Sequence, residues 1–145
     1  MSFSTDISAF VKKVEGNSDQ VVRKTVMAIT NEIIERSPVG DATYWKSKPP
    51  AGYVGGHFRG SWMMGINRLP TEDPGTIDPS GNATLSRAAA EIPRKAAGNV
   101  FYCASNLPYS MRIEEGWSRQ APQGVVGLTV LRFQEFIRAA LGELK

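Results

Sequence analysis

The chain has 145 residues, of which 41% are hydrophobic and 21% are charged, and its 17 basic and 14 acidic residues give a net charge of +3. This length suits one ordinary core, so we expect a single domain over residues 1–145, and the composition excludes a chain that is disordered throughout. No apolar run reaches the roughly 18 residues of a membrane-spanning helix, and the N-terminus lacks a signal-peptide pattern, so we expect a soluble protein made in the cytoplasm. The basic residues are scattered, which does not indicate a dedicated nucleic-acid binder.

The first secure element is a long amphipathic helix. Asn17 and Gln20 resemble a capping box and predict that this helix starts near Asn17, after a short, weakly amphipathic segment. Apolar residues then recur with helical spacing at Val22, Val26, Ile29 and Ile33. Pro38 disfavours helical geometry at Ser37, so the helix should end there.

Two loops flank the first predicted strand. Residues 38–60 contain three prolines and five glycines, a composition that predicts a long loop. Trp62, Met64 and Ile66 then alternate with other residues, as in a half-buried strand. Residues 69–83 are again rich in proline, glycine and acidic residues, and we expect them to form a mobile loop.

The second half of the chain predicts one more strand and two more helices. Residues 84–97 are rich in alanine and favour a short helix that Pro93 interrupts, and Val100 to Tyr102 favour a second strand. A helical stripe after Gly124 predicts a C-terminal helix of about five turns, through Val126, Val130, Phe133, Ile137 and Leu141. The fold class is therefore α+β, with a small antiparallel sheet packed against a long N-terminal helix and a C-terminal helix, joined by long extended loops.

Candidate catalytic groups are few. Glu114 and Glu115 are adjacent, so their side chains diverge and do not share one site, and His57 lies in a glycine-rich loop without an obvious partner. Cys103, the single cysteine, sits in a strand pattern and is expected to act as a small buried hydrophobe. We expect no catalytic residue, no metal site and no cofactor, although a small hydrolase using Glu114 or His57 stays an alternative.

Residues 106–124, NLPYSMRIEEGWSRQAPQG, are the most unusual stretch of the chain. Asn106 and Pro108 predict a turn, residues 111–117 predict one helical turn closed by Gly116, and residues 118–124 predict an extended, proline-stiffened arm. The stretch is either a rigid connector or a protein interface. The interface is favoured because Tyr, Trp and Arg are enriched where proteins bind one another, and this stretch has Tyr109, Arg112, Trp117 and Arg119.

The order of motifs resembles a known family. A long helix ends in SPVG, GHFRGSW then leads into a strand, and NLPYSMRIEEGWSRQAPQG precedes the last helix. This order is similar to that of the tail-completion and head–tail joining proteins, minor tail components of the neck of long-tailed bacteriophages. The resemblance implies a structural virion protein without catalytic residues, assembled in the bacterial cytoplasm into a ring at the head–tail junction.

The resemblance also implies the partners. The ring would be a homo-oligomer, a hexamer like the tail tube, and would contact neighbouring neck, tail terminator or tail tube proteins, with DNA passing through its lumen without specific binding. A closed ring requires two different complementary surfaces on each copy. We expect residues 109–123 to form one, including Tyr109, Arg112, Glu114, Trp117, Arg119, Gln120 and Pro122, and residues 44–59 to form the other, including Tyr53, His57 and Arg59. The alternative function is a small basic DNA-binding protein.

Overall fold

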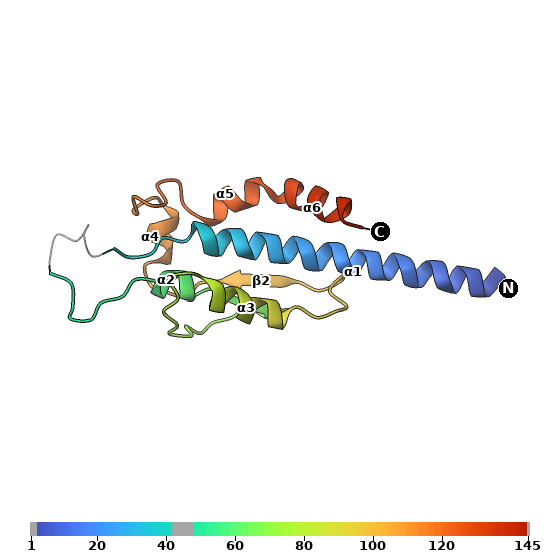
Figure 1. Ribbon diagram of the computed structural model, residues 1–145, viewed down its shortest axis with the longest axis horizontal. Coiled ribbons are helices and arrows are strands. Elements are labelled where there is room, and N and C mark those ends of the chain that lie inside the picture. The colour runs from blue at the N-terminus through green and yellow to red at the C-terminus, as the bar shows by residue number, and fades with distance from the viewer. Residues whose placement is uncertain (1–2, 42–47, 145) are drawn as a thin grey trace.

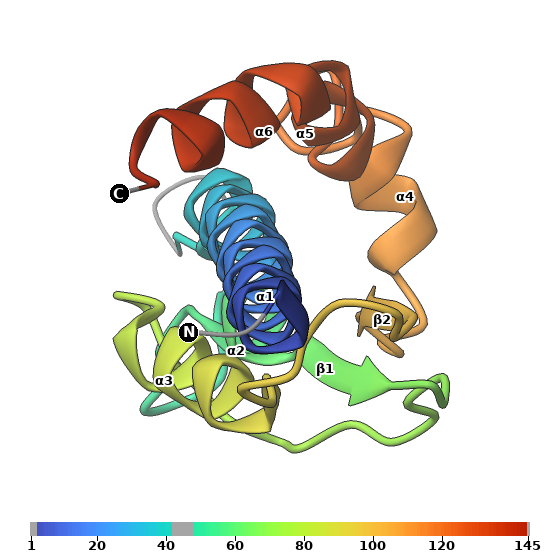
Figure 2. The same cartoon turned by 90° about the vertical axis from the view of Figure 1, so that its right-hand side faces the viewer.

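The computed structural model describes residues 3–41 and 48–144, and its central element is the helix α1 (Phe3–Arg36). Figure 1 shows α1 extending along most of the length of the molecule. Viewed along its axis, the remaining elements surround α1, with the C-terminal helices on one side and α3 (Asn82–Glu91) with the strands on the other (Figure 2). The C-terminal helix and α3 both contact α1.

The predicted start of the first helix is wrong. Helix α1 already includes Phe3 and continues through Gly16 and Asn17 without a break. Its N-terminal part carries apolar residues at helical spacing, and one interior glycine costs only about 1 kcal/mol relative to alanine, so the possible cap at Asn17 does not interrupt it. The predicted end is confirmed, because α1 ends at Arg36, just before Ser37 and Pro38.

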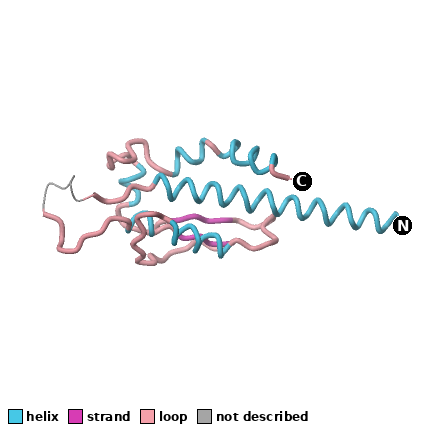
Figure 3. Tube along the Cα trace, in the orientation of Figure 1, coloured by secondary structure: helices cyan, strands magenta, loops and turns pink. Residues whose placement is uncertain are grey.

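The two predicted strands are confirmed, and with them the α+β fold class. Strands β1 (Met63–Ile66) and β2 (Phe101–Ala104) pair antiparallel, with Met64 opposite Cys103. Figure 3 shows how small this sheet is beside the helices and loops. Helix α3 packs against β1 and α1 and ends before Pro93, as predicted. The connection between the two strands therefore contains a whole helix.

Described parts of both predicted loops have structure that their composition does not indicate. The turn before β1 contains the short helix α2 (His57–Gly60). The segment expected to be mobile, residues 69–83, is held to the body by hydrogen bonds. Asn106 donates from its side-chain amide to the carbonyls of Pro70 and Glu72, each over 3.0 Å, and Arg87 donates to the Thr76 hydroxyl over 3.0 Å.

The region after Gly124 contains two helices rather than one of five turns, α5 (Val126–Leu131) and α6 (Phe133–Gly142). A separate short helix, α4 (Ser110–Glu114), lies where the sequence predicts one helical turn. The helical stripe after Gly124 is interrupted at Arg132, whose guanidinium forms ion pairs with Glu32 on α1 and Glu135 on α6. A contact with a distant helix thus sets the position of the break, and the local spacing of apolar residues contains no information about it.

The core lies where α1 ends, between residues far apart in the sequence. Its buried members are Ile33, Ile34, Phe58, Trp62, Leu107, Ala121 and Val125. Phe58 and Trp62 pack edge to face, with ring centroids 5.6 Å apart. Within residues 3–41 and 48–144, no helix is both long enough and apolar enough to cross a membrane.

Candidate functional site

Residues 118–124 do not form the extended arm that we predicted. They fold into two consecutive turns, in which the amide of Ala121 donates to the carbonyl of Ser118 over 3.1 Å and the amide of Gly124 donates to the carbonyl of Ala121 over 3.0 Å. The predicted helical turn and its glycine are confirmed, because Gly116 follows α4 with φ +91. Side-chain contacts described next hold the turns in place.

Glu114 links the end of α4 to the start of α5. Its carboxylate accepts hydrogen bonds from the backbone amides of Val125, Val126 and Gly127, over 2.9, 2.9 and 2.8 Å. Burial raises the pKa of Glu114, but the amides of Gly127, Val125 and Val126 together outweigh burial and hold the pKa below its ordinary value. Glu114 therefore caps the N-terminus of α5 with a negative charge, which a helix N-terminus favours. The neighbouring Glu115 is exposed.

Gln120 joins the segment to the chain that follows α1. Its side-chain amide pairs with both backbone groups of Val39: the Val39 amide donates to Oε1 over 3.0 Å, and Nε2 donates to the Val39 carbonyl over 2.6 Å. A glutamine that pairs with both the backbone N–H and the backbone C=O of one residue replaces the two hydrogen bonds of a neighbouring strand. Gln120 thus fixes the first turn against the SPVG motif.

Ser37 connects SPVG to GHFRGSW. Its buried hydroxyl donates to the carbonyl of Ile33 and accepts a hydrogen bond from the indole of Trp62, each over 2.7 Å. The guanidinium of Arg59 donates to the carbonyls of Ser37, Glu35 and Pro79. Arg59 therefore caps the C-terminus of α1, which the sequence did not reveal.

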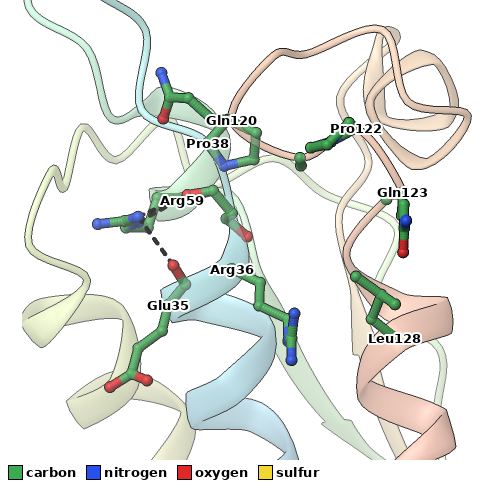
Figure 4. Close-up of a pocket in the computed structure, with 11 residues that line it drawn as sticks. Glu35, Arg36, Pro38, Arg59, Gln120, Pro122, Gln123 and Leu128 are labelled. Atoms are coloured by element: carbon green, nitrogen blue, oxygen red, sulfur yellow. Dashed lines mark hydrogen bonds between the residues drawn. The ribbon is translucent and has the colours of Figure 1, made fainter.

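A small hollow of about 310 Å³ lies beside these contacts. Figure 4 shows Arg59 and Glu35 on one side of it and Pro122, Gln123 and Leu128 on the other. Three predicted interface residues, Arg59, Gln120 and Pro122, line this hollow. The N–H groups of Arg59 already donate to backbone carbonyls. The role of Arg59 beside this hollow is therefore to stabilise the C-terminal end of α1.

A larger cleft, of about 730 Å³, combines most of the predicted interface residues. Three segments line it: residues 38–41, residues 53–58 and residues 109–120. Among the lining residues are Tyr53, His57, Tyr109, Trp117, Arg119 and Gln120. We refer to this feature as the aromatic cleft. Of the other predicted residues, Arg112 lies at the border, with its guanidinium 5.1 Å from the centre of the Trp117 ring.

The two segments that we expected to form separate interface surfaces meet in the aromatic cleft. Residues within 53–58 and 109–120 line it together, whereas Pro122 and Gln123 line the smaller hollow. Tyr44 to Ser47 lie outside the described residues. A ring contact of the kind predicted would need its second surface elsewhere on the molecule.

The walls of the aromatic cleft are aromatic and cationic. Trp117 is 70% exposed, whereas Tyr109 is partly covered and packs with its ring centroid 6.3 Å from that of Phe58. Burial, followed by the nearby Tyr53 and Asp73 side chains, raises the pKa of Tyr109, so its phenol stays a neutral hydrogen-bonding group. These are the side-chain types of a protein-binding surface.

The chemical groups that we considered for catalysis are placed as follows. His57 has a partner that the sequence did not predict, since its Nε2 lies 3.1 Å from a carboxylate oxygen of Asp73. Burial raises the pKa of the Cys103 thiol to about 12, so it stays protonated. Within the described residues, no group of three or more His, Cys, Asp or Glu side chains could hold a metal ion.

Sequence reasoning missed three residues with central structural roles: Ser37, Arg87 and Asp78. The carboxylate of Asp78 is buried and accepts from the amide and hydroxyl of Thr84, over 2.8 and 2.7 Å, at the start of α3. Burial raises the pKa of Asp78, but the hydrogen bonds from Thr84, Ser80 and Gly81 hold it below its ordinary value. An acidic residue ahead of a predicted helix was a usable signal for Asp78, whereas nothing local marks Ser37 or Arg87.

Comparison with protein-family models found no match, and comparisons with curated proteins and with solved structures found no match either.

Proposed function

We propose that this chain is a non-enzymatic structural subunit of the phage neck, a tail-completion or head–tail joining protein that assembles with copies of itself and connects the tail to the capsid. The observation that carries the proposal is the aromatic cleft, because the segments that support the family resemblance all contribute to it. Its lining combines Pro38 to Gly40 of SPVG, the start of GHFRGSW and part of residues 106–124.

The contacts between these motifs support the proposal. Ser37 accepts from Trp62, Arg59 donates to the Ser37 carbonyl, and Gln120 pairs with Val39. The motifs that resemble the family are therefore mutually bonded, which gives a physical reason for their occurrence together in one sequence. These contacts already order the segments around the cleft in the free protein. Binding of a partner therefore costs little additional conformational entropy.

The exposed side chains of the cleft also support protein binding. Large aromatic residues and arginines carry much of the binding free energy at protein interfaces, particularly where they lie at the centre of a pocket. Here Trp117 stands exposed with Arg112 stacked on it, and Tyr109 lines the cleft beside it. The cleft therefore has a suitable anchor for a neighbouring subunit.

Two measurements on phage particles test this function. Mass spectrometry of purified virions should detect the chain, and a phage in which its gene is disrupted should accumulate separate heads and tails. Absence of the chain from virions, together with normal infectivity of the disrupted phage, would overturn the proposal. Loss of an enzymatic activity in Glu114→Gln or His57→Ala, with folding intact, would favour the hydrolase alternative instead.

Trp117→Ala tests the cleft itself. Because Trp117 is 70% exposed, its replacement should change the free energy of unfolding by less than about 0.5 kcal/mol. Assembly into virions should fall strongly, because an interface anchor is lost. Thermal melts and complementation of the disrupted phage measure the two effects. Tyr102→Ala is the control, since Tyr102 is an exposed aromatic on β2 outside the cleft and should leave assembly unchanged.

DNA binding is less well supported. Arg59, Arg87 and Arg132 direct their guanidinium groups at carbonyls or carboxylates of the same chain, so they are less available for phosphates. A duplex binder loses affinity steeply as salt rises, because phosphate contacts release counterions. Titration of duplex and single-stranded DNA at two salt concentrations distinguishes the two functions, and strong, salt-sensitive binding would favour the DNA-binding alternative.

A further inference from the structure

The aromatic cleft contains three polar side chains that the chain itself does not use. Within residues 3–41 and 48–144, the hydroxyl of Tyr109, the indole N–H of Trp117 and the guanidinium of Arg119 form no hydrogen bond. An indole and a guanidinium only donate hydrogen bonds. Burial raises the pKa of Tyr109, so its phenol also keeps a proton to donate. A ligand that covers these groups must present acceptors, because a buried donor without a partner is costly.

The remaining polar groups of the cleft are already engaged. The other polar side chains that line it have partners: Asp41, Tyr53, His57, Ser118 and Gln120. The backbone is occupied as well. Gln120 takes both backbone groups of Val39, and the carbonyl of Gly56 accepts from the amides of Gly60 and Asp78. A partner that adds a strand needs a row of free backbone donors and acceptors, which these walls do not offer.

The rest of the cleft surface is aromatic and apolar. The Tyr109 ring lies 6.3 Å from that of Phe58, and Val54 lines the same cleft. Arg112 stacks on Trp117, and Trp117 nevertheless stays 70% exposed. A matching ligand therefore combines apolar surface with hydrogen-bond acceptors and needs few donors of its own.

We propose that the aromatic cleft binds an extended, proline-rich segment of a partner protein. A polyproline II helix has no internal hydrogen bonds, so its carbonyls are free to accept, and proline has no backbone N–H that would need a partner. Its rings supply the apolar surface, and aromatic-lined grooves are a recurring mode of recognising such segments. The inference rests on the proposed function, because that function requires a partner at the cleft. It adds the chemistry of that partner.

Two other kinds of partner match the cleft less well. An acidic segment would need cations, but among the described residues that line the cleft Arg119 is the only lysine or arginine, and Asp41 lines the cleft with it. An amphipathic helix uses most of its carbonyls for its own hydrogen bonds. It would therefore leave the donors of Tyr109 and Trp117 without acceptors.

Titration with a decaproline peptide tests the inference. Heteronuclear NMR of the isotope-labelled full chain follows the indole N–H signal of Trp117, which is identified by its absence in Trp117→Phe. Decaproline should shift this signal saturably. A glycine–serine peptide and a glutamate–serine peptide of the same length should bind at least about tenfold more weakly, because they lack the preformed apolar surface.

Tyr109→Phe is the sharpest variant, because it removes only a hydroxyl that forms no hydrogen bond in the described chain. It should weaken decaproline binding about two- to tenfold, the usual effect of one hydrogen bond. Tyr102→Phe is the matched control, since Tyr102 is 37% exposed outside the cleft and Tyr109 is 39% exposed. Trp117→Ala should weaken binding at least about tenfold. Thermal melts check that all these variants fold.

Three outcomes would overturn the inference: no saturable binding of decaproline, binding that Trp117→Ala leaves unchanged, or a control peptide that binds as tightly as decaproline. These results are separable from the proposed function. A chain that is found in virions and needs Trp117 for assembly, but does not bind decaproline, keeps its function and loses this partner chemistry. A chain that binds decaproline but is absent from virions keeps the chemistry of the cleft and loses the function.

Discussion

At the scale of single residues, a few polar side chains join segments that no regular element connects. Glu114 holds the end of α4 to the start of α5, Gln120 holds the first turn to Val39, and Ser37 holds α1 to Trp62. Of these contacts, the hydrogen bond from the Trp62 indole to Ser37 is buried. A buried donor without a partner costs about 1–3 kcal/mol, so this bond contributes substantially to the stability of the region.

Glu114→Gln should destabilise the protein by about 2 kcal/mol at neutral pH, because the charged cap of α5 is lost. The folded state holds the pKa of Glu114 below its ordinary value. The stabilisation that the ionised Glu114 provides is therefore fully present above the unfolded-state pKa of about 4. It is lost as the pH falls through the lower folded-state pKa. Urea unfolding of wild type and variant measures the difference, which should shrink in acid.

Glu115→Gln is the matched control for this experiment. Glu115 is exposed next to Glu114, so its replacement should change the free energy of unfolding by less than about 0.5 kcal/mol at any pH. Equal effects of the two substitutions would show that the cap does not stabilise α5.

Ser37→Ala should destabilise the protein by about 1–3 kcal/mol, because the buried indole N–H of Trp62 loses its acceptor. The fluorescence of the three tryptophans should also change if the surroundings of Trp62 relax. Ser18→Ala, at an exposed position of the same helix, is expected to be nearly neutral. A neutral Ser37→Ala would mean that water replaces the hydroxyl at no cost.

At the scale of elements, the structure differs from the prediction in the continuity of α1. The sequence contains a plausible cap at Asn17, yet the helix runs through it for a total of 34 residues. Conversely, the stripe after Gly124 predicts one helix, yet Arg132 divides it into two. Local signals thus locate helices well and locate their ends poorly where contacts with other elements compete.

Gly16→Ala tests this continuity. Gly16 is helical, and a Cβ added there would meet no atom within 4 Å. Alanine should therefore favour the helix by about 0.5–1 kcal/mol, raise the far-UV helical signal and slow hydrogen exchange of amides before residue 16. If the helix began at Asn17 instead, these signals would not change.

Gly116→Ala is the contrasting substitution. Gly116 has φ +91, and an added Cβ would collide with the carbonyl of Pro122. The substitution should destabilise the turns that border the aromatic cleft, whereas Gly16→Ala should not. Thermal melts of both variants against wild type compare the two positions.

At the scale of the whole molecule, the surfaces lie far apart. The aromatic cleft is lined in part by the residues that follow α1, whereas the exposed apolar residues Ile7, Phe10, Val11 and Val14 lie near its beginning. The length of α1 separates the two surfaces by about 50 Å at most. An elongated subunit with different surfaces toward its two ends can contact its own copies through one and other proteins through another. This division fits the neck position that we propose.

Cys103 reports on the stability of the whole fold. Burial raises the pKa of its thiol to about 12, so at mildly alkaline pH the folded protein should react with a thiol reagent much more slowly than the unfolded chain. The labelling rate should rise in parallel with unfolding as urea is added. Rapid labelling in the native protein would show that β2 opens by itself.

The sequence by itself determined four of the elements: a long amphipathic helix ending before Pro38, two short strands and an alanine-rich helix stopped near Pro93. It also singled out Tyr53, Tyr109, Trp117 and Arg119, which line the aromatic cleft, because aromatic and arginine residues mark surfaces by their chemistry. Only the tertiary structure decided that residues 53–58 and 109–120 form one cleft, that Glu114 and Arg59 are caps, and that the C-terminal helix breaks at Arg132. Each of these depends on a contact between residues distant in the chain, and periodicity and composition describe only neighbours.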